Sequence, residues 1–380
     1  MRYRRRAVAA GQALTNSDRG ILAAHQIEAL CGSGALTASL AFESAQFQPA
    51  SLDLRLSRRA WRMRASFLPG PERPVAECIG ALSLHAVDLA AGAVLETGCV
   101  YVAELAESLA LPTDVAACAN PKSSTGRIDV FTRVIADRAR EFDQIEAGYR
   151  GPLFAEISPR TFPILAREGS RLSQIRFRRG GARLDDAAHW ALHRKERLVT
   201  SAEPSIAGGV AVSVDLSGAG EDGLIGYRAK RHTGLIDVDR PGAQDAGEFW
   251  EALRAGRRRE LVLDPGEFYI LASKEAVRVP ADHAAEMTPF DPLVGEFRVH
   301  YAGFFDPGFG LAESGGEGSR AVLEVRSHDV PFILEHGQIV GRLVYEQMAQ
   351  APRLLYGAGL GSNYQAQGLK LSKHFRQTAF

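Results

Sequence analysis

An internal repeat is the feature that most restricts how this 380-residue chain can fold. Residues 96–117 match residues 264–285 without a gap, at an offset of 168 positions. The same offset relates residues 153–177 to residues 321–345. Two long blocks that share one offset are not expected by chance, so we interpret the chain as a tandem duplication of one structural unit.

Each repeat has the pattern of a mainly β domain. Short runs rich in β-branched and aromatic residues, such as VYVAEL, FYILAS and IVGRLVY, are separated by Gly, Pro and Asp. Many short strands with turn signals predict a barrel or a jelly-roll-like sandwich in each half. We place the first domain at residues 1–185, a helical linker at 186–204 and the second domain at 205–380. Further helical patterns occur at residues 20–30 and 247–256.

The charge balance argues against several classes of partner. Lys plus Arg and Asp plus Glu both total 45, so general affinity for nucleic acid or acidic membranes is not expected. No segment approaches the ~20 apolar residues of a membrane span, and the apolar stretch after the basic N-terminus is short for a signal peptide. The four cysteines contain no C-x-x-C pair, which favours reduced thiols over a zinc or disulfide framework. We therefore expect a cytoplasmic protein.

The segment NPKSSTGR, residues 120–127, is the first candidate site. Lys122 and Arg127 flank the hydroxyls of Ser123 and Ser124, and these groups together suit a phosphate. A capped polar loop is the alternative, because Ser and Thr are also ordinary capping residues. The second repeat has TPFDPLVG at the shared offset, without the cations or the Ser pair. Residues that one repeat can lose are not needed for the fold, which favours a ligand-binding segment.

The segment HYAGFFDPGFG, residues 300–310, is the second candidate. Asp306 lies in an Asp-Pro-Gly turn between aromatic residues, where its carboxylate could accept a hydrogen bond from a sugar hydroxyl while Phe309 packs against a ring. Simple turn chemistry is the alternative interpretation of Asp306.

A glutamate in an apolar strand is the third candidate. Glu324 lies within AVLEV, and the two-residue period of a strand places it on the same face as Val322. Apolar surroundings would raise the pKa of this carboxyl into the range useful for acid or base catalysis. An outward-facing glutamate on a solvated sheet face is equally compatible with the pattern.

These three segments resemble those of a known enzyme family. KSSTGR, AGFFDPGFG and AVLEV are similar to the Arg-Ser-Ser-Leu-Ala-Arg, Ala-His-x-Ile-Asp-Pro-Gly-Trp and Val-Leu-Glu-Phe segments of the dCTP deaminase family, within the trimeric dUTPase superfamily. QPASLDLRLS, LALPTDVAA, GQIVGRLVYEQM and the tail NYQAQGLKLSKHF resemble further family blocks. The resemblance implies two tandem dUTPase-like domains of the β-clip type. It also implies hydrolytic deamination of dCTP to dUTP and ammonia, without zinc and with Mg²⁺ bound only through the triphosphate.

The resemblance further implies roles for individual residues. Glu324 would be the general base that activates water for attack on cytosine C4, while Ser123 and Arg127 would position the base and the water. No protein side chain would be a metal ligand. The candidate substrate-binding residues are Lys122, Ser123, Ser124, Arg127, Ala302, Asp306, Phe309, Tyr364 and Gln367.

Several departures from the family pattern keep alternatives open. Lys122 replaces an arginine, and Phe304 stands where the family tends to have a basic residue. The first repeat keeps Glu156 but has IEAGYRG, which looks more like a dUTPase motif, in place of the Asp-Pro-Gly-aromatic turn. The alternatives are a dUTPase-like nucleotide pyrophosphatase and a non-catalytic deoxynucleotide-binding regulator.

The duplication also predicts how a site is assembled. In the superfamily that the chain resembles, an active site lies between neighbouring subunits. Here the first repeat carries the phosphate segment, and the second carries the nucleoside pocket, the glutamate and the tail. We therefore expect one composite site per pair of unlike repeats, within one chain or between two, and a homo-oligomer, either a trimer or a dimer.

Overall fold

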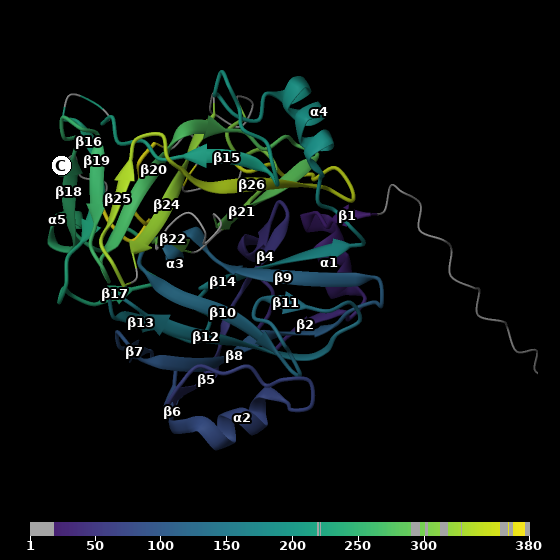
Figure 1. Ribbon diagram of the computed structural model, residues 1–380. Coiled ribbons are helices and arrows are strands. Elements are labelled where there is room, and N and C mark those ends of the chain that lie inside the picture. The colour runs from purple at the N-terminus through teal and green to yellow at the C-terminus, as the bar shows by residue number, and fades with distance from the viewer. Residues whose placement is uncertain are drawn as a thin grey trace, which may run out of the picture.

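The computed structural model describes residues 19–218, 220, 222–289, 297–300, 303–311, 318–327, 329–357, 364 and 368–376. Strands dominate these residues and the helices are short, so the predicted mainly β fold is confirmed. Figure 1 shows the purple and blue strands of the first repeat below the green and yellow strands of the second.

The first repeat forms two main antiparallel sheets. Its strands are β1 (Gly20–Ile21), β2 (Leu36–Ala38), β3 (Phe47–Gln48), β4 (Ser51–Leu54), β5 (Leu56–Met63), β6 (Ser83–Asp88), β7 (Ala93–Leu95), β8 (Val100–Ala110), β9 (Val115–Pro121), β10 (Val130–Ala136), β11 (Gln144–Ile145), β12 (Arg150–Pro159), β13 (Ile164–Ala166) and β14 (Ser173–Arg179). One sheet has the order β11-β9-β14-β4-β3, with β1 also paired to β14. The other has the order β10-β12-β8-β5-β6, with β2 also paired to β8.

The second repeat builds the same arrangement. Its strands are β15 (Val210–Ser213), β16 (Leu224–Ala229), β17 (Ile236–Asp237), β18 (Trp250–Arg254), β19 (Glu260–Leu263), β20 (Phe268–Val277), β21 (His283–Pro289), β22 (Phe297–His300), β23 (Phe304–Phe305), β24 (Ser319–Ser327), β25 (Phe332–Glu335) and β26 (Ile339–Gln347). The sheet orders are β15-β26-β21-β23 and β18-β16-β20-β24-β22, and β19 pairs with β25.

The duplication is visible in the strand register, because single residues of the two repeats have equivalent cross-strand partners. Glu156 on β12 lies opposite Val102 on β8, and Glu324 on β24 lies opposite Ile270 on β20. Both members of the second pair are 168 positions after their counterparts in the first. The two candidate glutamates therefore occupy equivalent places in equivalent sheets.

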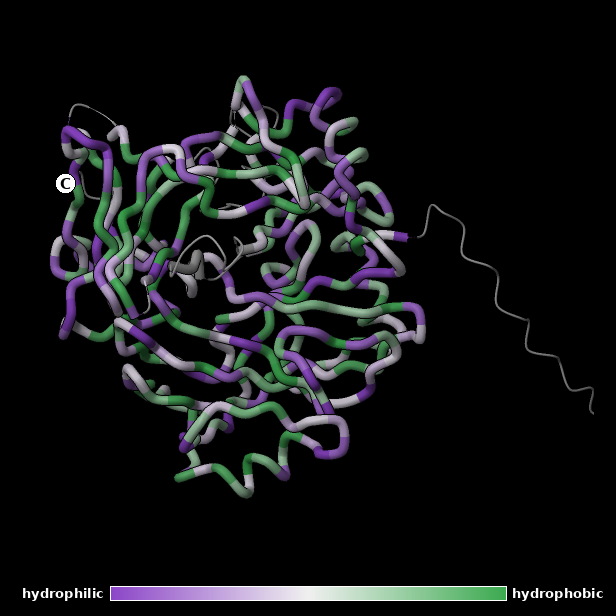
Figure 2. The backbone as a smooth tube through the Cα atoms, in the orientation of Figure 1, coloured by the Kyte–Doolittle hydropathy of each residue, from purple (hydrophilic) through white to green (hydrophobic). Residues whose placement is uncertain are grey.

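The two repeats pack against each other through a shared core. Phe162 of the first repeat contacts Phe249 and Trp250 of the second, with ring centroids 5.5 and 5.4 Å apart. Strand β17 of the second repeat pairs in parallel with β13, which itself pairs with β7. In Figure 2 green, hydrophobic stretches run through the strands of both repeats, with purple, hydrophilic positions between them. Strands β20 and β24 are buried along most of their length, so they lie inside the fold rather than at its surface.

The helices agree only in part with the predicted helical patterns. They are α1 (Ala24–Gly32), α2 (Val75–Leu82), α3 (Ser123–Gly126), α4 (Asp186–Glu196) and α5 (Ala246–Phe249), with the 3₁₀ turn η2 (Ser44–Gln46). The linker pattern produces α4, which Asp185 caps by accepting a hydrogen bond from the Ala188 N–H at 2.8 Å. Among the described residues, no helix is long and apolar enough to cross a membrane.

The helix predicted at residues 247–256 is wrong. Helix α5 ends at Phe249, and Trp250 begins β18 opposite Ala229. Phe249 and Trp250 are both buried in the shared core. Because these two large aromatic side chains are adjacent and both are buried, tertiary packing favours a strand that begins at Trp250. It overrides the helical pattern of the sequence.

Candidate active site

The predicted phosphate segment forms a single helical turn at the boundary between the repeats. Strand β9 ends at Pro121, and α3 follows at once, in the position between the two halves that Figure 1 shows. The Lys122 N–H donates to the Leu172 carbonyl oxygen at 2.9 Å, and the Gly126 N–H donates to the Lys122 carbonyl oxygen at 3.0 Å. These backbone bonds hold the turn beside the start of β14. The segment therefore has the fixed position that a binding element needs.

The predicted nucleoside segment faces this turn from the second repeat. Strand β23 leads into the turn at Asp306, where the Phe309 N–H donates to the Asp306 carbonyl oxygen at 3.1 Å. Phe309 packs between Phe305 and Tyr356, with ring centroids 5.1 and 5.6 Å away. Aromatic packing thus fixes the turn and leaves the Asp306 side chain at the edge of a cavity.

That cavity has a volume of about 270 Å³ and is lined by both repeats of one chain. Ala302 and Gln367 lie outside the described residues. The structure brings the other candidate residues together around the cavity, namely Lys122, Ser123, Ser124, Arg127, Asp306, Phe309, Glu324 and Tyr364. The phosphate and nucleoside segments thus meet within one chain.

Glu324 is buried, so the solvated orientation that the sequence left open does not occur. Glu324 is 6% exposed. Val322 lines the same cavity, as the two-residue period of the strand predicts. Burial raises the pKa of Glu324 to about 8, because a charged carboxylate loses its hydration there, while the positive charge of Arg127 opposes the shift. The Arg127 Nε lies 3.9 Å from Glu324 Oε1. Glu324 can therefore exchange a proton near neutral pH.

Arg127 contacts the C-terminal segment as well as Glu324. Its Nη1 donates to the Lys370 carbonyl oxygen at 2.9 Å, and its guanidinium lies 3.9 Å from the centre of the Tyr364 ring. The Ser372 hydroxyl donates to the Ser124 carbonyl oxygen at 2.8 Å. The tail thus covers the phosphate segment of the first repeat.

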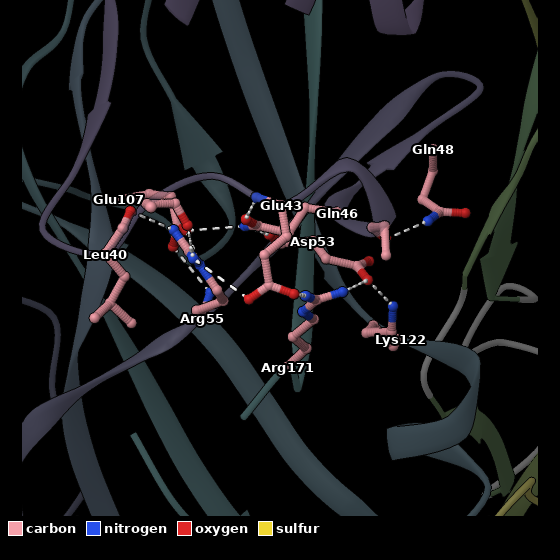
Figure 3. Close-up of polar contacts among 11 residues, drawn as sticks. Leu40, Glu43, Gln46, Gln48, Asp53, Arg55, Glu107, Lys122 and Arg171 are labelled. Atoms are coloured by element: carbon pink, nitrogen blue, oxygen red, sulfur yellow. Dashed lines mark hydrogen bonds and ion pairs between the residues drawn. The ribbon is translucent and has the colours of Figure 1, made fainter. Parts of the chain in front are cut away.

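A buried carboxylate lies beside the phosphate segment. Asp53 Oδ2 forms an ion pair with the Lys122 ammonium and lies 3.9 Å from Arg171 Nη1, and Figure 3 shows the three side chains converging. Asp53 Oδ1 is buried and has no hydrogen-bond partner among the described residues. The buried Arg55–Glu107 pair in the same view, at 2.9 Å, is linked to this cluster through Glu43, which pairs with both Arg55 and Arg171.

Sequence reasoning missed several residues that line the cavity. Arg171 and Lys373 add two cations at the end where Lys122 lies, and both also border a neighbouring hollow with Asp239. The sequence position of Arg171 gives no signal of this, because the fold of the first repeat brings it beside Asp53. Lys373 lies in the tail block NYQAQGLKLSKHF that the resemblance included, so that block could have suggested it. Asp53 lies in the SLDLRL block that the resemblance included, so that block could have suggested it.

Among the residues that the structure describes, no group of three or more His, Cys, Asp or Glu side chains could hold a metal ion. The four cysteines are free thiols.

Comparison with known families gives matches along most of the chain. The model of the 2'-deoxycytidine 5'-triphosphate deaminase (DCD) N-terminal domain matches residues 18–181. The model of the C-terminal domain of the same enzyme matches residues 185–375.

A solved structure matches most of the chain, and curated relatives match about a third of it. The crystal structure of 2'-deoxycytidine 5'-triphosphate deaminase from Agrobacterium tumefaciens is 63% identical, with a TM-score of 0.87, over 90% of this chain and 100% of that chain. A "dCTP deaminase, dUMP-forming" from Beutenbergia cavernae is 31% identical over 129 residues, 33% of this chain and 63% of that relative. A protein of the same name from Halobacterium salinarum is 33% identical over 112 residues, 28% of this chain and 53% of that relative. The chain thus spans less than two thirds of the length of these curated relatives.

Proposed function

Since the chain belongs to the 2'-deoxycytidine 5'-triphosphate deaminase family, we propose that it converts dCTP and water to dUTP and ammonia. The observation that carries the proposal is the cavity in which a buried carboxyl with a pKa of about 8 lies opposite a cationic, hydroxyl-rich turn. The first group suits proton transfer at the base, and the second suits a phosphate chain.

Glu324 is the proposed general base. As a carboxylate it takes a proton from water, and the resulting hydroxide oxygen bonds to cytosine C4. Protons then pass to the ring N3 and to the C4 amino group, the C4–N bond breaks, ammonia leaves and the uracil carbonyl forms. A base with a pKa near the working pH is efficient at both accepting and returning the proton.

Arg127 and Ser123 are proposed to position the reacting groups. The Arg127 guanidinium lies beside Glu324 and is fixed by Tyr364 and the Lys370 carbonyl, so its charge is preorganised rather than free to reorient. Ser123 begins α3 and lines the same cavity. Its hydroxyl can both donate and accept hydrogen bonds, as orienting a water and a base edge requires.

The phosphate chain is proposed to bind where Lys122, Ser124, Arg171 and Lys373 line the cavity. The lysine at 122 lacks the planar fork of an arginine, and Arg171 supplies such a fork at the same end. Asp306 and Phe309 are proposed to contact the sugar and base, together with Tyr364 from the tail.

Mg²⁺ is proposed to enter with the triphosphate, and Asp53 fits it as a ligand, which departs from the expectation that no protein side chain would be a metal ligand. Asp53 Oδ1 is a buried carboxylate oxygen with no hydrogen-bond partner among the described residues, and Asp53 lines the phosphate end of the cavity. Carboxylate and phosphate oxygens together suit Mg²⁺. Bound there, the ion would neutralise part of the triphosphate charge.

The test is product analysis with purified protein, dCTP and Mg²⁺. Chromatography should show dUTP and an equal amount of ammonia. Tight dCTP binding in calorimetry without either product would instead select the non-catalytic regulator.

A second candidate is deamination followed by cleavage to dUMP and diphosphate, which consumes a second water. It is favoured by the names of the curated relatives, which are dUMP-forming, and by the GYRG segment at residues 148–151. Appearance of dUMP and diphosphate from dCTP would select it, and cleavage of dUTP without deamination of dCTP would select a pyrophosphatase alone.

We also propose that the protein works in the cytoplasm as a homo-oligomer, a trimer or a dimer, as the superfamily resemblance implies. Light scattering in solution tests the assembly, because a mass equal to that of one chain would contradict it.

A further inference from the structure

One arginine of the first repeat contacts the nucleoside segment of the second. Arg176 lies on β14 and is 0% exposed. Its Nη1 donates to the Ala285 carbonyl oxygen at 3.1 Å, and its Nη2 lies 3.4 Å from both the Phe305 carbonyl oxygen and Asp306 Oδ1. Its guanidinium carbon lies 4.1 Å from the centre of the Phe304 ring. This one side chain therefore contacts Phe304, Phe305 and Asp306 across the boundary between the repeats.

The fold itself does not call for an arginine at this place. The equivalent position of the second repeat, 168 residues later, is Val344, a buried apolar residue on the equivalent strand β26. A buried guanidinium is costly unless carboxylates compensate it. Here Asp306 does so together with Glu346, whose Oε2 lies 3.5 Å from Arg176 Nη1. The charge of Arg176 is thus compensated through its contact with the other repeat, by Asp306 and Glu346.

We propose that Arg176 is a positioning residue, which holds Asp306 so that its carboxylate accepts a hydrogen bond from the 3′-hydroxyl of the deoxyribose. The inference rests on the proposed function. Arg176 engages Oδ1 of Asp306, and a carboxylate held through one oxygen can accept a ligand hydrogen bond through the other. Phe304, which stands where the related family tends to have a basic residue, carries the Arg176 guanidinium on its ring. The positive charge thus reaches this turn from the other repeat.

The experiment compares kcat/KM for dCTP with that for its 2′,3′-dideoxy analogue, which lacks only the 3′-hydroxyl. The variants are Arg176→Lys and Arg176→Met, and the matched control is Arg183→Met. Arg183 lies 3.8 Å from the same Glu346 and 2.9 Å from Glu286, but it is more than half exposed and does not line the cavity.

In the wild type, the analogue should be poorer by roughly tenfold or more, as expected for a lost hydrogen bond to a charged group. This preference should shrink toward unity in Arg176→Met and fall to an intermediate value in Arg176→Lys, which keeps the charge without the fork. Arg183→Met should keep the wild-type preference. In Asp306→Asn, adding Arg176→Lys should change the preference no further, because both residues act through one carboxylate.

A general loss of folding would lower both rates equally and leave their ratio unchanged. Folded Arg176 variants with the wild-type preference would overturn the inference. So would failure of both Arg176 variants to fold while Asp306→Asn folds, since Arg176 would then serve the fold alone. Absence of dCTP turnover in the wild type would refute the proposed function instead.

Discussion

Glu156 and Glu324 occupy the same position in the two repeats, yet their surroundings differ. Both are buried on the central strand pairs β8–β12 and β20–β24. Glu156 lies opposite Arg133 on the neighbouring strand, whose Nη2 donates to its Oε1 at 2.6 Å. Glu324 lies opposite His300 on β22, and its Oε1 lies 3.9 Å from the Arg127 Nε at the wall of a cavity.

The difference shows how one scaffold position can form a closed ion pair in one repeat and line a cavity in the other. In the first repeat the direct ion pair occupies the carboxylate of Glu156. Arg133 is itself packed against the Phe142 ring, 3.5 Å from its centre, so the pair in the first repeat is locked in place. Burial, which the charge of Arg127 opposes only in part, raises the pKa of Glu324 to about 8, and the side chain has open space beside it.

The largest test of this comparison removes each carboxylate in turn. Glu324→Gln should lower kcat by roughly 10²–10⁴-fold, because the general base is lost. Glu156→Gln should keep nearly full activity but lower Tm, since it weakens a buried ion pair by on the order of 1–3 kcal/mol. Steady-state kinetics and calorimetry measure the two effects. A greater loss of activity in Glu156→Gln would reverse the assignment.

The pH dependence of activity sharpens the same comparison. Glu324 must be a carboxylate to accept a proton, and its pKa is raised to about 8 by burial. We expect kcat/KM to fall about tenfold per pH unit as the pH drops below about 8. Glu156→Gln should show the same profile as the wild type. A profile that stays flat down to pH 6 would contradict a general base with this pKa.

Removing the cation of the first repeat tests whether the ion pair of Glu156 serves the fold. In Arg133→Met the buried carboxylate loses its partner, and a buried charge without a partner is costly. The variant should therefore lose stability relative to the wild type, by roughly 3–5 kcal/mol. Denaturant unfolding measures this loss, and a stability equal to that of the wild type would show that Glu156 does not depend on Arg133.

The smallest effect concerns the tail, which contacts the first repeat at the cavity of Glu324. Ser372→Ala removes the hydrogen bond to the Ser124 carbonyl oxygen, worth about 1 kcal/mol. We expect KM for dCTP to rise a few-fold with kcat little changed. The matched control is Ser327→Ala, which removes a similar bond to the Val330 carbonyl oxygen at 2.6 Å. Equal KM values for both variants would mean that the tail does not secure the phosphate segment.

Much of the fold was predictable because a duplication doubles the sequence signal. The repeat located equivalent strands, and the loss of the Lys122–Arg127 pattern from one repeat marked that segment as functional. The burial of Glu324 was undecided, since a two-residue period gives a face but does not say what covers it. Arg171 could not be found, because the fold of the first repeat brings Glu43 and Asp53 to it from far away in the sequence. Arg176 could not be found either, because its partners depend on how the repeats pack. The strand at Trp250 was missed for the same reason.

The cavity draws its two walls from one polypeptide, and this has a consequence for how activity depends on concentration. A covalent tether gives the two walls an effective local concentration in roughly the millimolar range, which dilution of the protein does not change. If the activity depends only on this cavity, specific activity should therefore stay constant when the protein is diluted. A site shared between separate chains would instead lose activity below their dissociation constant.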